Sequence, residues 1–160
     1  MGLLPRTRVF VDEPTVEEAE ALAELHADGF ARGWSADDVA ALMSGDDLIA
    51  LAVRRESLFG LRRIVGFVIA RIAADEAEIL TIAVSRARRG GGFGRMLMEE
   101  MLRRLYRERV ACFLEVNRDN GPALALYRSL GFEEVGTRKG YYDSVEGSGG
   151  SALVMRLQLR

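Results

Sequence analysis

The residues best suited to chemistry form a basic, glycine-rich segment, Arg88-Arg-Gly-Gly-Gly-Phe-Gly-Arg95. An apolar, β-branched run precedes this segment and an amphipathic run follows it, so we expect it to join a strand to a helix. Glycines would let the backbone approach a ligand closely, and the start of the helix would present unpaired N–H groups at the positive end of its dipole. With arginines on both sides, the segment suits a phosphate or pyrophosphate.

The glycine spacing excludes two common phosphate-binding motifs. A dinucleotide-binding fingerprint needs G-x-G-x-x-G, and counting from Gly90 places Arg95 in its last position. A Walker A loop needs Gly-Lys followed by Ser or Thr, but the only lysine in the sequence is Lys139. The pattern that remains is Arg89-x-x-Gly92-x-Gly94.

Hydrophobic periodicity and helix caps predict the elements around this segment. Strands are expected at 8–11, 48–53, 64–72, 78–84, 111–116, 133–138 and 152–159. Helices are expected after the capping boxes at 15–18 and 35–38, and over 93–105 and 121–130. The order βααβββαβαββ predicts an α/β fold with a mixed, mostly antiparallel central sheet flanked by helices. No linker divides residues 1–160, so a single domain is predicted.

Composition and charge narrow the class of protein. The 160 residues are 49% hydrophobic and 29% charged, as is usual for a globular chain, and no apolar run approaches a membrane span. One cysteine and one histidine argue against a disulfide and a metal site, and the first ten residues lack the apolar core of a secretory signal, so a cytoplasmic protein is expected. Residues 86–109 carry a net charge of +5 and the remainder −7, which favours a local anion site over a nucleic-acid or membrane partner.

The pattern Arg89-x-x-Gly92-x-Gly94 resembles the acetyl-CoA pyrophosphate signature, Gln/Arg-x-x-Gly-x-Gly/Ala, of the GNAT superfamily of N-acetyltransferases. More narrowly, the chain is similar to the bacterial RimI-type ribosomal-protein-alanine N-acetyltransferases from about residue 22 to residue 157. Stretches that carry this likeness are 29–35, 77–84, 114–120, 125–132, 141–142 and 152–157. The chain departs from the usual pattern at Gly91 and at 147–150.

The resemblance implies an acetyl-CoA site with no metal. Loop amides would hold the pyrophosphate, and the pantetheine arm would lie between the strand ending at Val84 and the strand containing Glu115. Asn120, whose own pattern predicts only a helix cap, matches a cofactor contact of the family. The implied cofactor-binding residues are Ile82, Ala83, Val84, Arg89, Gly90, Gly91, Gly92, Phe93, Gly94, Arg95 and Asn120.

The resemblance also assigns the acid and the base. By pattern alone, Glu115 is equally a solvated residue or a carboxylate within an apolar strand, and Tyr127 is a core tyrosine. The family places its general base at Glu115 and, at Tyr127, the donor of a proton to the departing thiolate. Cys112 is expected to be a core residue rather than a nucleophile, and His26 a helix-face residue.

The predicted function is direct acetyl transfer from acetyl-CoA to a primary amine, with a basic ribosomal-protein N-terminus, or protein N-termini more broadly, as the acceptor. Acidic clusters at 12–20 and 37–47 suit a basic peptide, and the resemblance places Trp34, Tyr141 and Tyr142 near it. Two alternatives remain: an acetyltransferase for small amines such as antibiotics, polyamines or amino acids, and a non-catalytic acyl-CoA-binding regulatory module. Binding alone needs neither Glu115 nor Tyr127, which argues against the module.

Overall fold

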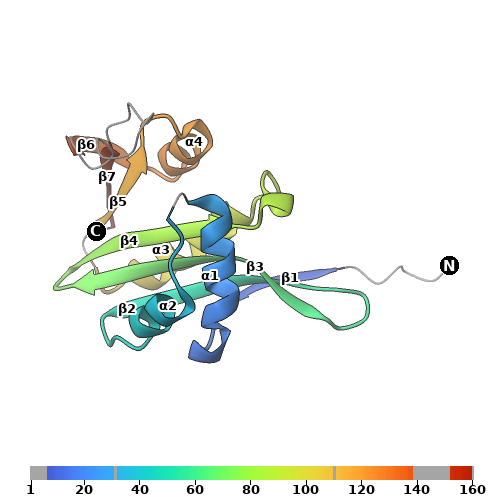
Figure 1. Cartoon of the computed structure of the whole chain (residues 1–160). Coiled ribbons are helices and arrows are strands. Elements are labelled where there is room, and N and C mark those ends of the chain that lie inside the picture. Colours follow the sequence, from blue (N-terminus) through green and yellow to red (C-terminus); the bar gives the residue numbers. More distant parts are fainter. Residues whose placement is uncertain (1–6, 31, 110, 139–151, 160) are drawn as a thin grey trace. The chain divides into compact units, whose positions relative to one another are not determined.

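A computed structural model describes residues 7–30, 32–109, 111–138 and 152–159 of the chain (Figure 1). Seven strands pair in the order β1-β2-β3-β4-β5-β7-β6. The strands are β1 Arg8–Asp12, β2 Leu48–Glu56, β3 Arg62–Ala73, β4 Glu76–Val84, β5 Ala111–Asn117, β6 Glu133–Arg138 and β7 Ala152–Gln158. The helices are α1 Ala19–Gly29, α2 Ala36–Met43, α3 Phe93–Leu105 and α4 Gly121–Ser129, with 3₁₀ turns at Val16–Glu18 and Arg86–Arg88. The predicted α/β fold and its element order are confirmed.

The chain forms two compact units, residues 1–70 with 81–102 and residues 71–80 with 103–160. Strands β3 and β4 and helix α3 run from one unit into the other. The expectation of a single domain stays a prediction.

In the first unit, helices cover both faces of the β2–β4 region, with α1 and α2 on one face and α3 on the other (Figure 1). Leu97, Met98 and Met101 of α3 are fully buried, as its amphipathic pattern predicts. Gly66 on β3 permits this close packing. A Cβ at that position would lie 3.3 Å from Leu97 Cδ1 and 3.0 Å from the carbonyl oxygen of Ala83.

Strand β2 extends three residues beyond its predicted end, where it pairs with β1 as far as Glu56 opposite Arg8. β1 pairs antiparallel with β2, and Arg54 Nε donates to Asp12 Oδ1 at 2.6 Å. The same guanidinium donates to both carboxylate oxygens of Glu18, at 2.6 and 2.8 Å. These hydrogen bonds lower the pKa of Glu18 to about 2. Two members of the acidic cluster at 12–20 are therefore ion-paired with one arginine within the fold.

In the second unit, β5 is paired on both sides. Its parallel register with β4 runs from Glu76 opposite Ala111 to Ile79 opposite Leu114, and its antiparallel register with β7 covers the whole strand. The paired stretch of β4 and β5 ends there, although β4 continues to Val84 and β5 to Asn117.

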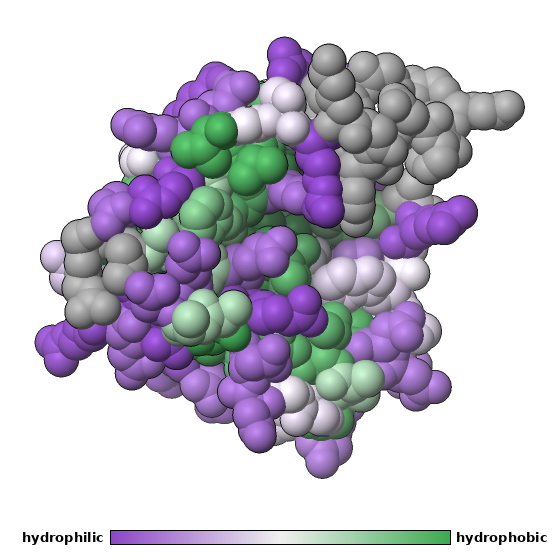
Figure 2. Space-filling view, turned by 90° about the vertical axis from the view of Figure 1, so that its left-hand side faces the viewer, coloured by the Kyte–Doolittle hydropathy of each residue, from purple (hydrophilic) through white to green (hydrophobic). Residues whose placement is uncertain are grey.

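Figure 2 draws one face of the chain. On the face drawn in Figure 2, hydrophilic side chains predominate and apolar ones appear in small separate patches. Among the helices of the described ranges, none is long and apolar enough to cross a membrane.

Candidate active site

The glycine-rich segment forms an open turn between β4 and α3. Gly90 has φ +82° and Gly92 has φ +84°, a conformation that residues with a Cβ rarely adopt. A Cβ at either position would meet nothing within 4 Å, so the space beside the backbone is open. Met96 donates the first amide bond of α3, to the carbonyl of Gly92 at 3.1 Å. Phe93 and Gly94 precede that bond, in the first turn of the helix, where backbone amides point out of the helix end.

Two arginines hold this turn in place. Arg89 Nε donates to the carbonyl of Val84 at 3.3 Å, and Arg86 Nη2 donates to the carbonyl of Asp28, at the end of α1, at 3.2 Å. Gly29 leaves room for this arrangement, since a Cβ there would lie 3.3 Å from Arg89 Nη2. The two guanidinium groups thus connect the segment before the glycines to the end of β4 and the end of α1.

Strand β4 leads directly into the turn. Ala83 is buried, whereas the side chains of Ile82 and Val84 lie on the less buried face of the strand. Beyond Ile79 the strand has no further paired register with β5. The predicted pantetheine contacts fall on this end of β4, beyond its paired register with β5.

Glu115 lies on the half-exposed face of β5, between the buried residues Leu114 and Val116. Its Oε1 accepts a hydrogen bond from Arg138 Nη1 of β6 at 2.7 Å, and 26% of its side chain is exposed. The sequence left Glu115 either as a solvated residue or as a carboxylate within an apolar strand. In the structure it is partly buried and has a charged partner. Sequence patterns missed Arg138 because it lies 23 residues away along the chain.

Tyr127 is buried on α4, with only 6% of the residue exposed. Its ring makes an edge-on contact with Phe132 at a centroid distance of 5.9 Å. Burial raises the pKa of the tyrosine to about 12, so its hydroxyl keeps its proton at neutral pH. A protonated hydroxyl is the form that a proton donor requires.

Asn120 caps α4, as its pattern predicts. Its Oδ1 accepts a hydrogen bond from the amide of Ala123 at 3.2 Å. The structure places Glu115, Asn120 and Tyr127 in the second unit and the loop residues in the first. The cofactor and catalytic roles of all these residues remain predictions.

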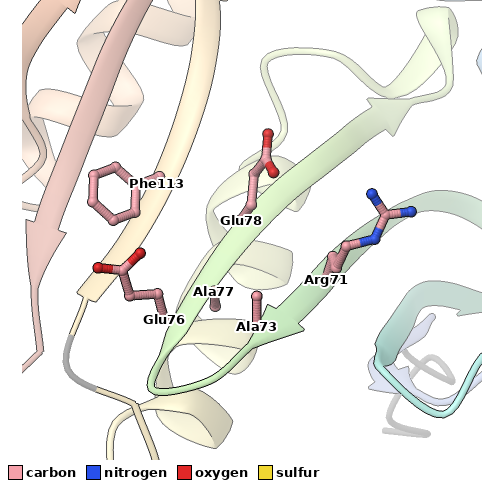
Figure 3. A pocket seen from close by; sticks show the side chains of 6 residues that line it. All are labelled: Arg71, Ala73, Glu76, Ala77, Glu78 and Phe113. Atoms are coloured by element: carbon pink, nitrogen blue, oxygen red, sulfur yellow. The ribbon is translucent and has the colours of Figure 1, made fainter.

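A hollow of about 280 Å³ opens on the face of the second unit that carries Glu115 (Figure 3). Phe113 lines it two residues before Glu115 on β5, and Glu78 lies beside Phe113 in the register of β4. In Figure 3 Glu76 lies on the same side as Phe113, Arg71 lies on the opposite side on β3, and Ala73 and Ala77 lie on the hairpin between those two sides. The hollow thus combines an aromatic wall with two exposed carboxylates and one guanidinium.

His26 and Trp34 form an aromatic stack in the first unit. The imidazole lies between Phe30 and Trp34, with ring centroids 4.2 and 4.3 Å away. Its Nδ1 accepts a hydrogen bond from the backbone amide of Trp34 at 3.1 Å, which requires the neutral ring. Trp34 also lines a hollow of about 450 Å³ with residues of α2. Tyr141 and Tyr142, also predicted to contact the acceptor, lie outside the described residues.

The stack predicts a pH-dependent stability. Burial lowers the pKa of His26, so the unfolded chain binds this proton more readily than the folded one. The free energy of unfolding is therefore expected to fall as the pH drops below about 6.5, the ordinary histidine pKa. Urea unfolding between about pH 7 and pH 5.5 measures this, because the carboxylates titrate lower. In His26→Phe this dependence should disappear, and an unchanged slope would contradict the account.

Cys112 is buried on β5, as expected for a core residue. Burial raises the pKa of its thiol to about 12, so it carries no thiolate at neutral pH. Within the described ranges, no group of three or more His, Cys, Asp or Glu residues could hold a metal ion.

Comparison with known proteins decides the family. Residues 19–132 match the family described as the acetyltransferase (GNAT) family. The chain belongs to the GNAT family. This match covers most of the chain, and it confirms the resemblance drawn from the glycine pattern.

Curated relatives of this GNAT chain include N-terminal acetyltransferases. The ribosomal protein bS18-alanine N-acetyltransferase of Salmonella typhimurium is 39% identical over 98 residues, which cover 61% of this chain and 66% of that protein. The N-alpha-acetyltransferase RimI of Mycobacterium tuberculosis is 46% identical over 81 residues, which cover 51% of this chain and 48% of that protein. An uncharacterized Mycobacterium leprae protein is 48% identical over 81 residues, covering 51% of this chain but 21% of that protein. The GNAT chain thus spans less than two thirds of these relatives.

Solved structures agree with the fold of the GNAT chain. The ribosomal-protein-S18-alanine N-acetyltransferase from Escherichia coli has a TM-score of 0.83 at 27% identity, covering 95% of this chain and 94% of that one. Arabidopsis thaliana NAA60, in complex with a bisubstrate analogue, has a TM-score of 0.82 at 20% identity. The match covers 94% of this chain and 98% of that one. The first of these also confirms the narrower resemblance to RimI-type enzymes.

Proposed function

We propose that this GNAT chain transfers an acetyl group from acetyl-CoA to the N-terminal α-amine of a protein with a basic N-terminal sequence. The observation that carries the proposal is the open turn before α3, where two glycines with positive φ leave space beside the start of the helix. Such a site binds a pyrophosphate through the backbone, and coenzyme A carries one. Family membership supports acetyl-CoA as the donor.

The proposed cofactor site follows β4 into the turn. Backbone amides within Gly90 to Arg95 hold the pyrophosphate, although the amide of Gly91 already donates to the carbonyl of Arg88 at 3.3 Å. Arg89 contributes positive charge. The pantetheine arm runs along Ile82, Ala83 and Val84, which lie beyond the stretch of β4 paired with β5. Asn120, in the second unit, is also proposed as a cofactor-binding residue.

The proposed reaction is direct attack of the neutral amine on the thioester carbon. Glu115 accepts the proton that the attacking amine loses, directly or through a water molecule. As the C–S bond breaks, the electron pair goes to sulfur, and Tyr127 donates its proton to the thiolate. The hydroxyl carries the proton that this step needs at neutral pH.

The proposed acceptor is basic because of the carboxylates beside Glu115. Phe113 and Glu115 share one face of β5, and residues two apart on a strand lie about 6–7 Å apart. An extended peptide whose amine reaches Glu115 could therefore place its next side chains over the hollow that Glu76 and Glu78 line. The bS18-alanine specificity named for the Salmonella typhimurium relative supports a protein N-terminus. We also propose that the protein acts in the cytoplasm.

Substitution of both Glu76 and Glu78 tests the proposed preference for a basic acceptor peptide. In Glu76→Gln/Glu78→Gln, we expect kcat/KM for an Ala-Arg-starting peptide to fall about 3- to 10-fold at low salt, since exposed ion pairs contribute up to about 1 kcal/mol each. The value for an otherwise identical acidic peptide should not fall. Initial rates at low and high salt measure both, and high salt should remove most of the difference.

A matched variant separates local from general electrostatics. Glu24→Gln/Glu133→Gln removes the same charge from exposed positions outside both the acidic clusters and the hollow. Equal losses in the two double variants would assign the preference to net charge alone. If a polyamine reacts better than either peptide, the acceptor is a small amine and not a protein N-terminus.

A further inference from the structure

A β-bulge in β6 changes which face of the sheet its later residues occupy. Glu134 pairs with Met155 of β7, whereas Gly136 pairs with Val154, so Val135 is an extra residue in the ladder. Without the bulge, strict alternation would place Val135 opposite Val154 and direct Arg138 to the other face. The bulge therefore determines where the Arg138 side chain projects.

The register across β7 shows which face this is. Val154 also pairs with Glu115, and Ala152 pairs with both Asn117 of β5 and Arg138 of β6. Paired residues of neighbouring strands project to the same face. Arg138 consequently shares a face with Glu115, one step further along the ladder.

Small residues leave room for the guanidinium to reach back along this face. Gly136, in the row of Glu115, has no side chain, and a Cβ there would meet nothing within 4 Å. Ala152, in the row of Arg138, has only a methyl group. Arg138 Nη1 accordingly reaches Glu115 Oε1 at 2.7 Å.

We propose that Arg138 is a positioning residue for Glu115, an inference that rests on the proposed role of Glu115 as the base. The guanidinium fixes the carboxylate through Oε1 and directs Oε2 toward the acceptor amine or its water. Stability does not account for the pair, because 60% of the Arg138 side chain is exposed and ion pairs at such positions contribute little.

A double-mutant cycle on turnover tests the proposal. Arg138→Gln is expected to lower kcat about 10-fold, as misplacement of a catalytic group does, while KM for acetyl-CoA and the melting temperature stay unchanged. Arg138→Lys should restore part of kcat, because it can still donate to Oε1. In the Glu115→Gln background, Arg138→Gln should cause no further loss, since the group it positions is absent. Arg107→Gln, which removes one exposed positive charge from the same unit, serves as the control.

The outcomes distinguish this inference from the proposed function. A silent Arg138→Gln, or a 10-fold loss that persists in the Glu115→Gln background, would overturn the positioning role while leaving Glu115 as the base. Full activity of Glu115→Gln would overturn both, because no base would then remain for Arg138 to position.

Discussion

Replacing Glu115 by glutamine is expected to lower kcat by about 10²-fold or more at neutral pH, the usual contribution of a general base. The amide keeps the size of the side chain but cannot take the proton of the attacking amine. Initial rates at saturating acetyl-CoA and Ala-Arg peptide measure the loss. Affinity for acetyl-CoA, measured by isothermal titration, should stay within a few-fold of the original.

A matched variant shows whether the loss belongs to this carboxylate. Glu133→Gln removes the same charge from an exposed position on β6 and should retain full activity. If Glu115→Gln keeps the original rate from about pH 6 to pH 9, the base lies elsewhere or bulk water suffices.

Gly92→Asp is expected to abolish acetyl-CoA binding. The substitution places a carboxylate in the open space beside the turn, where it repels the pyrophosphate and competes for the amides. It also forces a residue with a Cβ into φ +84°, which costs about 1–2 kcal/mol. Isothermal titration with acetyl-CoA measures the loss.

Gly60→Asp is the matched control for this loop substitution. Gly60 has φ +79° in the β2–β3 hairpin, and a Cβ there also meets nothing within 4 Å. The control therefore introduces the same charge and a similar strain away from the proposed site, and it should bind acetyl-CoA normally. Binding that survives Gly92→Asp would show that the turn does not hold the pyrophosphate.

Local signals predicted the fold well because they depend on near neighbours in the sequence. The helix α2 begins at its predicted capping box, where Ser35 Oγ and Asp38 Oδ2 each accept the other residue's amide at 3.1 Å. Asn120 caps α4 in the predicted way, and the apolar spacing of α3 identified its buried face. The glycine pattern located the turn as well, since positive φ favours glycine.

Long-range partners were not predictable in the same way. The pairing of Glu115 with Arg138 depends on the register of three strands and on a bulge that no short pattern marks. Arg54 likewise joins Asp12 and Glu18, residues that the sequence presents only as part of an acidic cluster. Charged side chains on strands carry no periodic signal, so their partners emerge only once the sheet is assembled.

Whether this chain acetylates a protein α-amine, as proposed, can be read from the position of the acetyl group in the product of one reaction. An Ala-Arg-starting peptide that also contains a lysine is incubated with acetyl-CoA and the chain, and fragment-ion mass spectrometry locates the acetyl group. The account predicts a single acetyl group on the N-terminal amine, formed far more slowly by Glu115→Gln. Acetylation of the lysine side chain, or no acetylation under conditions where acetyl-CoA binds, would contradict it.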